Sequence, residues 1–271
     1  MKIFSHLTYS LLHKSVAAPA PREDMTIASY NVRYFNHNND FGKCHWYVRA
    51  KYILRNIEKM QPDVLCLQEV HPPQFDFFKK HLVGYDSVIG YRDDKKSSEA
   101  CPIYYNTARF TLLDSGTFWL SDTPDVMSKF EDSWHYRIST FVKLRDADGT
   151  VLTVFNVHPD YRIEEVRIRQ LSVLADRVAK AEGKVIITGD FNAEKGEKCL
   201  EPFEALLRDS KDFRGDVFGA TFNGFGVKPE ESIDFIYLPK DCTLLDTGID
   251  KSVYDGVYPS DHYPIFARVR F

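Results

Sequence analysis

The chain ends in the stretch YPSDHYPIFARVRF, residues 258–271, and this stretch decides how the fold is built. Apolar residues alternate from Ile265 to Val269, which places every second side chain on one face of a β-strand and predicts that the chain ends in a core. Asp261 and His262 stand directly before that strand. Ordinary turns also contain Pro, Ser and Asp, so the pair gains meaning only if other strands carry similar side chains at their ends.

Five further predicted strands carry polar residues at or near one end. These residues are Asn31 in SYNVR, Glu69 in LQEV, His158 in NVHPD, Asp190 and Asn192 in GDFN, and Asp234 in SIDFIY. Each alone is what the edge of any sheet looks like. Asp234 is the most informative, because a carboxylate inside an apolar strand costs free energy unless it is paired. His158 and His262 are the two partners that the pattern offers.

Carboxylates make up a large part of this set. Glu69, Asp190 and Asp261 would repel one another at a common mouth, and would raise one another's pKa, unless a cation neutralised them. Oxygen-rich ligation of this kind suits Mg²⁺ or Mn²⁺ rather than zinc. The five cysteines are widely spaced and form no C-x-x-C pair, which favours a mostly reduced protein and gives no sign of a zinc site.

Between these motifs the pattern predicts about ten strands and only two long helices, at residues 46–60 and 163–183. Gln61-Pro62 and Gly183 are the expected stops. The first helix is expected to turn four side chains inward: Val48, Tyr52, Leu54 and Ile57. Two helices among so many strands do not make a regular βαβ alternation, so we expect two β-sheets packed together with helices over their outer faces.

Residues 25–271 are expected to form one domain, since they contain no repeat, linker or low-complexity tract. Residues 1–24 are set apart as an N-terminal extension or a targeting segment. Two targeting alternatives stay open: a secretory signal whose apolar stretch is interrupted by Ser and His, and an amphipathic helix with Ile3, Leu7 and Leu11 on one side. A plain extension is favoured, and with it a cytoplasmic location over a secreted or organellar one.

Composition restricts the partners. The 271 residues are 44% hydrophobic and 27% charged, as in a soluble globular protein, and carry a net charge of −4. Nucleic-acid-binding domains usually present a dense basic face, which this composition does not favour. Two local basic clusters, at residues 92–96 and 162–169, are interpreted first as solvated surface. No apolar run approaches the roughly 20 residues that span a membrane.

The six motifs also resemble, in the same order, those of the endonuclease/exonuclease/phosphatase superfamily, which includes deoxyribonucleases, abasic-site endonucleases, inositol-polyphosphate phosphatases, neutral sphingomyelinases and deadenylases. The resemblance covers residues 25–271, and GDFN followed by IDFIY and a terminal SDHYP is very specific. It implies an α+β fold, a four-layer α/β sandwich in which two packed, mostly antiparallel β-sheets are flanked by helices. It also implies an enzyme, a Mg²⁺-dependent phosphoester hydrolase in which Mn²⁺ could replace Mg²⁺.

By the same resemblance, the metal is held by Glu69 with the help of Asn31 and Asp261, directly or through water. His262 is expected to serve as the general base or to orient the water, and Asp234 to hold the other ring nitrogen of His262. Asp261 and His262 precede the last strand because both side chains must point into one phosphate-sized site.

The resemblance implies three further catalytic residues. Asp190 shares the activation of water with His262, in a proportion that the sequence does not settle. Asn192 positions water or phosphate, and His158 donates a hydrogen bond to a phosphoryl oxygen. One departure from the superfamily is Pro159, which replaces the usual leucine of N-x-H-L-D. Because proline fixes φ and lacks an N–H, it puts the aim of His158 in question.

Substrate contacts are expected from the rim of the site, with Arg92, Phe222 and Phe225 as the candidates. The acidity of the chain favours a small or lipid phosphate ester slightly over a nucleic acid, so the alternative is an endo- or exonuclease acting on DNA or RNA. A non-catalytic binding module on the same fold would be expected to have lost a site residue, and none of the principal set is missing. A monomer is assumed.

Overall fold

The computed structural model describes residues 13–215, 218–227 and 231–271. Two six-stranded sheets form its centre, and the first has the strand order β13-β14-β2-β3-β6-β5. Its strands are β2 (Met25–Asn31), β3 (Val64–Gln68), β5 (Tyr85–Val88), β6 (Ile103–Asn106), β13 (Thr243–Ile249) and β14 (Ile265–Arg270). The central pair, β2 and β3, is parallel, and the other neighbours are antiparallel.

The second sheet repeats this plan, with the order β11-β12-β10-β9-β8-β7. Its strands are β7 (Phe110–Trp119), β8 (Ile138–Asp146), β9 (Val151–Val157), β10 (Lys184–Asp190), β11 (Leu207–Asp209) and β12 (Asp234–Pro239). Here β9 and β10 are the parallel pair, and the other neighbours are antiparallel. The short strands β1 (Val16–Ala17) and β4 (Leu82–Val83) form a separate parallel pair.

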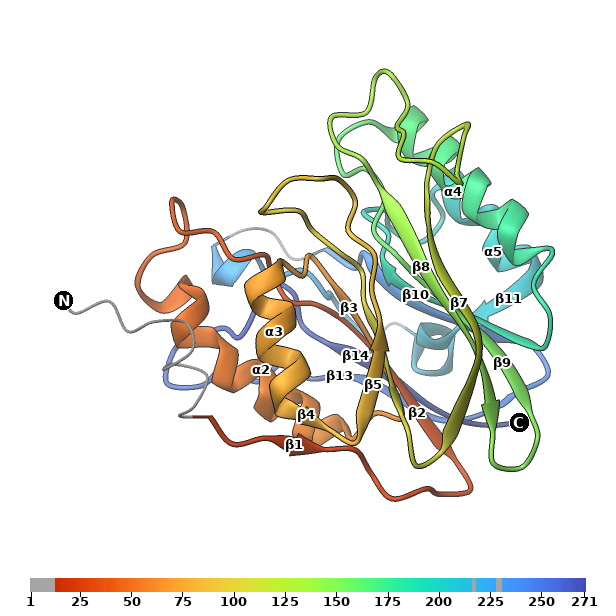
Figure 1. The fold of residues 1–271 in the computed structure, drawn as a ribbon, viewed down its shortest axis with the longest axis horizontal. Coiled ribbons are helices and arrows are strands. Elements are labelled where there is room, and N and C mark those ends of the chain that lie inside the picture. The colour runs from red at the N-terminus through yellow and green to blue at the C-terminus, as the bar shows by residue number, and fades with distance from the viewer. Residues whose placement is uncertain (1–12, 216–217, 228–230) are drawn as a thin grey trace.

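Each central parallel pair is joined through a crossover helix, as parallel pairing requires. α2 (Trp46–Met60) connects β2 to β3, and α4 (Glu164–Val178) connects β9 to β10. Figure 1 shows α2 and α3 (Pro72–His81) on one side of the paired sheets and α4 and α5 (Glu201–Leu206) on the other. The layers therefore run helix, sheet, sheet, helix, and the α+β four-layer sandwich expected from the sequence is confirmed. Single 3₁₀ turns occur at Gly42–Cys44, Lys198–Leu200, Ser210–Phe213 and Gly224–Gly226.

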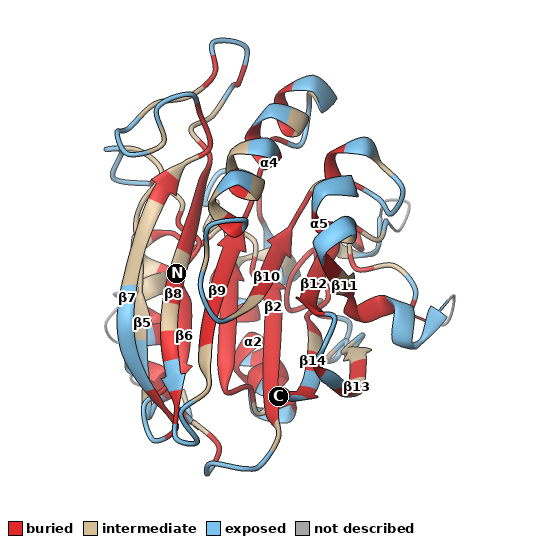
Figure 2. Cartoon of the chain, turned by 90° about the vertical axis from the view of Figure 1, so that its right-hand side faces the viewer, coloured by how far each residue is buried: buried red, intermediate tan, exposed pale blue. Residues whose placement is uncertain are grey.

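Apolar side chains from both sheets meet between them, and the alternation along each strand explains which ones they are. Ile265, Ala267 and Val269 of β14 are fully buried in this layer, as their spacing predicts. Phe266 points the other way and packs in the layer formed with α2 and α3. Figure 2 shows the central strands as buried and the outer face of α4 as exposed. Each fully buried Ile or Val side chain contributes about 1.5–3 kcal/mol to folding.

α2 buries three of the four side chains that were expected to point inward, Tyr52, Leu54 and Ile57. The buried stripe consists of Trp46, Ala50, Ile53, Leu54 and Ile57, with the three- and four-residue spacing of one helix face. Val48 lies opposite that stripe and is 36% exposed, so its expected inward placement was wrong. Tyr52 also lies off the stripe, but it is buried because its ring stacks on Tyr254, with 4.7 Å between the centroids.

α3 was not expected from the sequence, which suggested two long helices. Its segment PPQFDFFKKH opens with two prolines and is too short to show a helical period clearly. Proline is well tolerated in the first helical turn, where the N–H groups have no intrahelical partner. The backbone N–H of His71 donates to the side-chain oxygen of Gln74 at 3.1 Å, and Phe77 and Phe78 are fully buried against α2.

α4 is shorter than expected, because it ends at Val178 rather than close to Gly183. Gly183 instead forms the entry to β10, with φ at +81°. A Cβ atom there would lie 2.4 Å from the carbonyl oxygen of Val151, which is closer than any side chain tolerates. Glycine at this position therefore serves the close approach of β9 rather than the end of the helix.

Residues 13–24, which the sequence analysis set apart from the domain, run along its surface. β1 pairs with β4, and the side-chain amide of Asn106 donates to the carbonyl oxygen of Pro19 at 2.8 Å. Arg22 forms an ion pair with the buried Asp63 at 2.9 Å. These contacts join the segment to the first sheet.

The remaining expectation for the N-terminus, an amphipathic stretch through Ile3, Leu7 and Leu11, falls on residues 1–12 and lies outside the described residues. Within the described ranges, no helix has both the length and the apolar character that crossing a membrane requires.

Candidate active site

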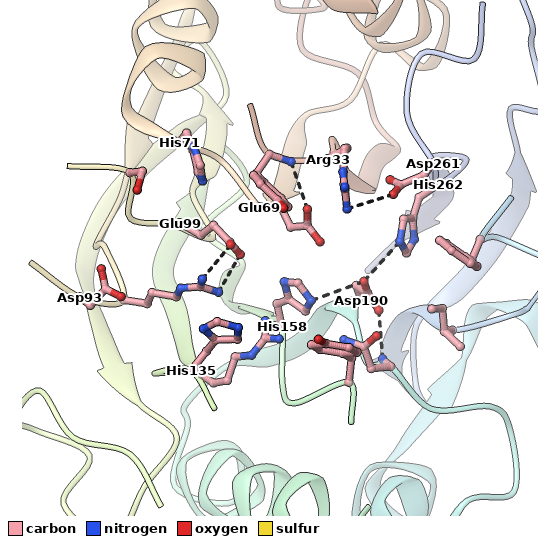
Figure 3. Close-up of a pocket in the computed structure, with 18 of the residues that line it drawn as sticks. Arg33, Glu69, His71, Asp93, Glu99, His135, His158, Asp190, Asp261 and His262 are labelled. Carbon is pink, nitrogen blue, oxygen red and sulfur yellow. Dashed lines mark hydrogen bonds and ion pairs between the residues drawn. The ribbon is translucent and has the colours of Figure 1, made fainter. Parts of the chain in front are cut away.

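The polar motifs lie together at one end of the sandwich because of the direction of the strands that carry them. The carboxyl ends of the parallel strands β2 and β3 meet at one edge of the first sheet, and those of β9 and β10 meet at the matching edge of the second. β12 and β14 run antiparallel to these strands, so they begin at the same edge. A cavity of about 670 Å³ opens there, shown in Figure 3. Six of the predicted catalytic and metal-binding residues line it: Glu69, His158, Asp190, Asn192, Asp261 and His262.

β2 and β10 end in turns of the same kind, and these turns orient the last side chain of each strand, Asn31 and Asp190. The side-chain oxygen Oδ1 of Asn31 accepts a hydrogen bond from the N–H of Arg33 at 3.0 Å, and Oδ1 of Asp190 accepts one from the N–H of Asn192, also at 3.0 Å. Arg33 and Asn192 have φ angles of +55° and +51°, and Glu69, directly after β3, has +61°. Left-handed backbone is uncommon for residues other than glycine and concentrates at functional sites.

The GDFN motif after β10 has a steric explanation. Gly189 has φ at +151°, and a Cβ atom there would lie 2.1 Å from the carbonyl oxygen of Val157 in β9. Only glycine allows the two strands to approach so closely beside the site. Phe191, on the other side of Asp190, is fully buried among Phe203 and the rings of β12, and so anchors the turn.

His262 forms a buried pair with Asp234. Its Nδ1 lies 2.9 Å from Oδ2 of Asp234, and its Nε2 lies 3.6 Å from Oδ2 of Asp190. Burial would lower the pKa of His262, but the charges of Asp234 and Asp190 outweigh it and raise the pKa to about 10. Burial, together with the charge of Asp234, raises the pKa of Asp190 to about 7 although His262 opposes this. The histidine partner that Asp234 was expected to need is therefore His262.

Asn31 links the two halves of the site. Its side-chain nitrogen donates to Oε1 of Glu69 at 3.1 Å and to Oδ2 of Asp190 at 2.9 Å. The second oxygen of Glu69 accepts the N–H of Tyr34 at 3.1 Å. Burial would raise the pKa of Glu69, but the charge of Arg33 and these hydrogen bonds act in the opposite direction and lower it. Glu69 is thus held ionised.

Asp261 completes the acidic side of the cavity. Arg33 lies 3.6 Å from its Oδ2, and Arg33 also pairs with Asp40. Burial and the charge of Glu69 raise the pKa of Asp261, against the attraction of His262. Arg33 was not expected in the site, although it lies within the SYNVR motif, because an arginine after a strand carries no signal until its neighbours are known.

Three carboxylates, Glu69, Asp190 and Asp261, thus face one cavity, and this donor set fits a divalent cation with oxygen ligands. Asp190, Asp234 and His262 could also hold a metal ion, since one ligand atom from each lies within 4.8 Å of the others. Nδ1 of His262 and Oδ2 of Asp234 are already bound to each other, which leaves Nε2 of His262 and Oδ1 of Asp234 as the atoms that a metal could use there.

His158 points into the site in spite of Pro159. Its Nε2 lies 3.7 Å from Oδ2 of Asp190. Burial and the positive charge of Arg137 lower the pKa of His158 well below its usual value, so the imidazole is neutral. The carbonyl oxygen of Pro159 accepts a hydrogen bond from the side-chain nitrogen of Asn192 at 3.3 Å, so the proline segment also helps to position Asn192.

The predicted substrate contacts are only partly brought together. Arg92 and Phe222 line the cavity. Phe225 does not, and its placement at the rim needs correction: the left-handed φ of +59° turns its ring toward Arg49, with 5.5 Å between the centroid and Cζ. The sequence analysis missed several lining residues whose place depends on long-range packing: Tyr34, His71, His135, Arg137 and Tyr161.

In the basic cluster at 162–169, Arg162 and Arg169 lie on the surface, as expected, whereas Arg167 is buried. Arg162 stacks over the ring of Trp134, Arg167 pairs with Glu197, and Arg169 pairs with Asp132. These arginines are absent from the residues that line the cavity among those the structure describes.

Comparison with known proteins agrees with this geometry. The model of the Endonuclease/Exonuclease/phosphatase family matches residues 28–262. Among solved structures, an endonuclease/exonuclease/phosphatase family protein from Bacteroides thetaiotaomicron is 28% identical, with a TM-score of 0.82 over 91% of this chain and 94% of that chain. A mannosyl-6-phosphatase from the same species is also 28% identical, with a TM-score of 0.81 over 91% of this chain and 100% of that chain.

A curated relative extends the range of similar proteins. The CCR4-Not complex 3′-5′-exoribonuclease subunit Ccr4 of Mycosarcoma maydis is 24% identical over 92% of this chain and 50% of its own length. The chain thus spans about half the length of that relative.

Proposed function

The chain belongs to the endonuclease/exonuclease/phosphatase family, and from that premise we propose that it hydrolyses a small phosphate ester with the help of Mg²⁺ and by direct attack of water. Its relatives are hydrolases that act on phosphoester bonds, and metal-dependent phosphoester hydrolysis is the activity of the family. One observation carries the proposal. His262, bound to Asp234 at 2.9 Å, faces Asp190 across the same cavity that Glu69 lines.

Glu69 and Asp261 are the residues that we assign to the metal. A divalent cation bound there would supply positive charge to the phosphoryl oxygens and to the leaving oxygen. Asn31 donates its N–H group to Glu69 in the arrangement described, so its role is to orient that carboxylate. Mn²⁺ shares the preference of Mg²⁺ for oxygen ligands and could replace it.

Asp190 and His262 are the residues that we assign to the attacking water. Oδ2 of Asp190 and Nε2 of His262 are 3.6 Å apart, so one water molecule could contact both. A pKa of about 7 suits Asp190 to accept the proton of that water near neutral pH. Asp234 keeps Nδ1 of His262 occupied and so decides which ring nitrogen faces the water. Asn192 holds the other oxygen of Asp190.

His158 is assigned to a phosphoryl oxygen of the substrate. It is buried and neutral, so it can donate a hydrogen bond without bringing a full charge. In the reaction, the water oxygen forms a bond to phosphorus, the bond from phosphorus to the ester oxygen breaks, and the alcohol leaves with a proton. A donor at the phosphoryl oxygen stabilises the charge that develops in this step.

A small substrate is favoured over a polynucleotide by the charges around the cavity. Arg92 pairs with Glu99 at 2.8 Å, and Lys95 lies 3.7 Å from Asp93, so neither cation is free to follow a nucleic-acid backbone. A cavity of about 670 Å³ is within the ordinary range for a small ligand. The second candidate is a nuclease acting on DNA or RNA, which the similarity to an exoribonuclease subunit favours.

Mg²⁺-dependent hydrolysis of a paired panel tests the proposal. One half holds single-stranded and duplex oligonucleotides, and the other holds nucleoside monophosphates, sugar phosphates, bis-p-nitrophenyl phosphate and sphingomyelin. We expect turnover in the second half, lost in His262→Ala and kept in the surface control Arg177→Gln, whose side chain pairs with Asp125 outside the cavity. Turnover of oligonucleotides alone would establish the nuclease instead.

A further inference from the structure

One wall of the cavity differs in character from the carboxylate side. Arg92, Lys95, His135 and Arg137 line it. Figure 3 places His135 and Glu99 on the side of the cavity away from Asp261 and His262, with His158 and Glu69 between the two sides. Arg137 shares a small hollow in this wall with Glu69 and His158, so the wall adjoins the residues assigned to the metal and to the phosphoryl oxygen.

Among the cations that line this wall, Arg137 is the one without a direct ion pair, although the charges of Glu99, Asp160 and Glu69 act on it from a greater distance. Arg92 and Lys95 each have a carboxylate partner, Glu99 and Asp93 respectively. Arg137 is only 4% exposed, and its Nε has no hydrogen-bond partner. No ion pair involving Arg137 occurs among the residues that the structure describes. The side chain lines the cavity, so the missing partner can reach it from there.

A buried guanidinium without a direct ion pair lowers the stability of a fold, because more distant charges repay its desolvation only in part. Burial and repulsion from Arg92 lower the pKa of Arg137, against the attraction of Glu99, Asp160 and Glu69. A structural arginine would be expected to have a carboxylate or carbonyl partner, as Arg109 has in Asp146 at 2.7 Å. An anionic ligand is the partner that would satisfy Arg137, and the planar fork of a guanidinium fits two oxygens of one phosphate.

We propose that Arg137, with His135 beside it, binds a second phosphate group of the substrate, and that the substrate class is a small organic bisphosphate. One phosphate is hydrolysed on the side of Glu69 and His262. The second stays intact on Arg137 and takes no part in bond making or breaking. The cavity is large enough for this, since about 670 Å³ far exceeds the space that one phosphate group fills. The inference rests on the proposed phosphoesterase function.

Kinetics with matched substrates test the second phosphate. The Mg²⁺-loaded protein is assayed with fructose 1,6-bisphosphate against fructose 6-phosphate, and with adenosine 3′,5′-bisphosphate against adenosine 5′-monophosphate. We expect at least one bisphosphate to be preferred, with a kcat/KM ratio of roughly ten or more, and Arg137→Gln to reduce that ratio by a factor of about 10–100, as loss of a charge-assisted hydrogen bond does. Arg177→Gln, with the same change of charge outside the cavity, should keep the ratio.

Two kinetic results would overturn the inference. No preference for either bisphosphate in the wild type is the first. The second is an equal loss of kcat/KM for mono- and bisphosphates in Arg137→Gln, which would place Arg137 on the reacting phosphate.

A binding measurement separates this inference from the proposed function. Inorganic pyrophosphate is added to metal-free protein, and the melting temperature is followed. We expect pyrophosphate to raise the melting temperature of the wild type and of His262→Ala, but not that of Arg137→Gln or Arg137→Met. Without ligand, both Arg137 variants should melt about 2–4 °C higher than the wild type, because an unpaired charge has been removed.

The outcomes of the two measurements are distinguishable. Stabilisation by pyrophosphate that depends on Arg137, with no hydrolysis of any phosphate ester, would support the anion site and defeat the phosphoesterase. Lower melting temperatures in both Arg137 variants, with no response of the wild type to pyrophosphate, would make Arg137 a structural residue and overturn the inference.

Discussion

Asp234→Asn is the substitution that examines the His262 pair most closely. The change keeps the size of the side chain and removes its charge 2.9 Å from Nδ1 of His262. Two opposite charges at that distance attract by about 6 kcal/mol at an effective dielectric constant of about 20. A fall in the pKa of His262 from about 10 to about 7 corresponds to about 4 kcal/mol, so the loss of this charge is large enough to cause it.

The predicted result has two parts. NMR titration of the metal-free protein should show His262 losing its proton close to neutral pH instead of near pH 10. The Mg²⁺-dependent kcat should fall about 10²–10⁴-fold, the usual contribution of general acid–base catalysis. Asp209→Asn is the matched control, because Asp209 is also a buried carboxylate but accepts the N–H of Lys211 instead of holding His262. A kcat within threefold of wild type, with His262 still protonated at pH 8, would refute the reasoning.

Further predictions address the metal, the GDFN turn, the pH dependence and the core. Glu69→Gln should abolish the rise in melting temperature that Mg²⁺ gives the wild type, and EDTA should abolish turnover; calorimetric titration with Mg²⁺ gives the direct check. Gly189→Ala should destabilise the fold by about 2–4 kcal/mol in urea unfolding, because its Cβ would meet a carbonyl oxygen at 2.1 Å; unchanged stability would contradict the steric explanation. Burial lowers the pKa of both His71 and His135 to about 4, so the unfolded chain binds more protons than the folded one between pH 6.5 and 4. The free energy of unfolding should therefore fall as the pH falls across that window. Urea unfolding at several pH values should show a shallower dependence on pH in the variant with both histidines replaced by Gln. Leu174→Ala should cost about 2–5 kcal/mol, since Leu174 is fully buried between α4 and the second sheet, and calorimetry of this variant measures it.

The parts of the site that lie at strand ends could be predicted from the sequence. An acidic residue inside the apolar run of β12 required a partner, and the structure pairs Asp234 with His262. The alternation from Ile265 to Val269 also fixed the face of β14 that enters the core. These inferences worked because period and burial are local properties of a strand.

Other parts of the site and of the core depend on which helices and strands pack together, and the residue pattern of a single element does not show this. Val48 was expected to point inward because the sequence does not show which of the two apolar faces of α2 packs against the first sheet. Phe225 was placed at the rim because the left-handed turn that points it at Arg49 leaves no mark on the sequence pattern. Arg33 and Arg137 were missed because an arginine beside a strand is ordinary until the carboxylates around it, or their absence, are known.

We propose that Glu69 and His262 act in the same metal-dependent hydrolysis of a phosphate ester, and one measurement tests this directly. The measurement is the initial rate of release of inorganic phosphate or alcohol from the best substrate of the panel, with Mg²⁺ titrated from zero, for wild type, Glu69→Gln and His262→Ala. We expect saturable activation by Mg²⁺ in the wild type, and turnover lower by about a hundredfold or more in both variants, which is the usual size of such effects. Wild-type turnover that is independent of Mg²⁺, or that persists in either variant, would contradict the proposal.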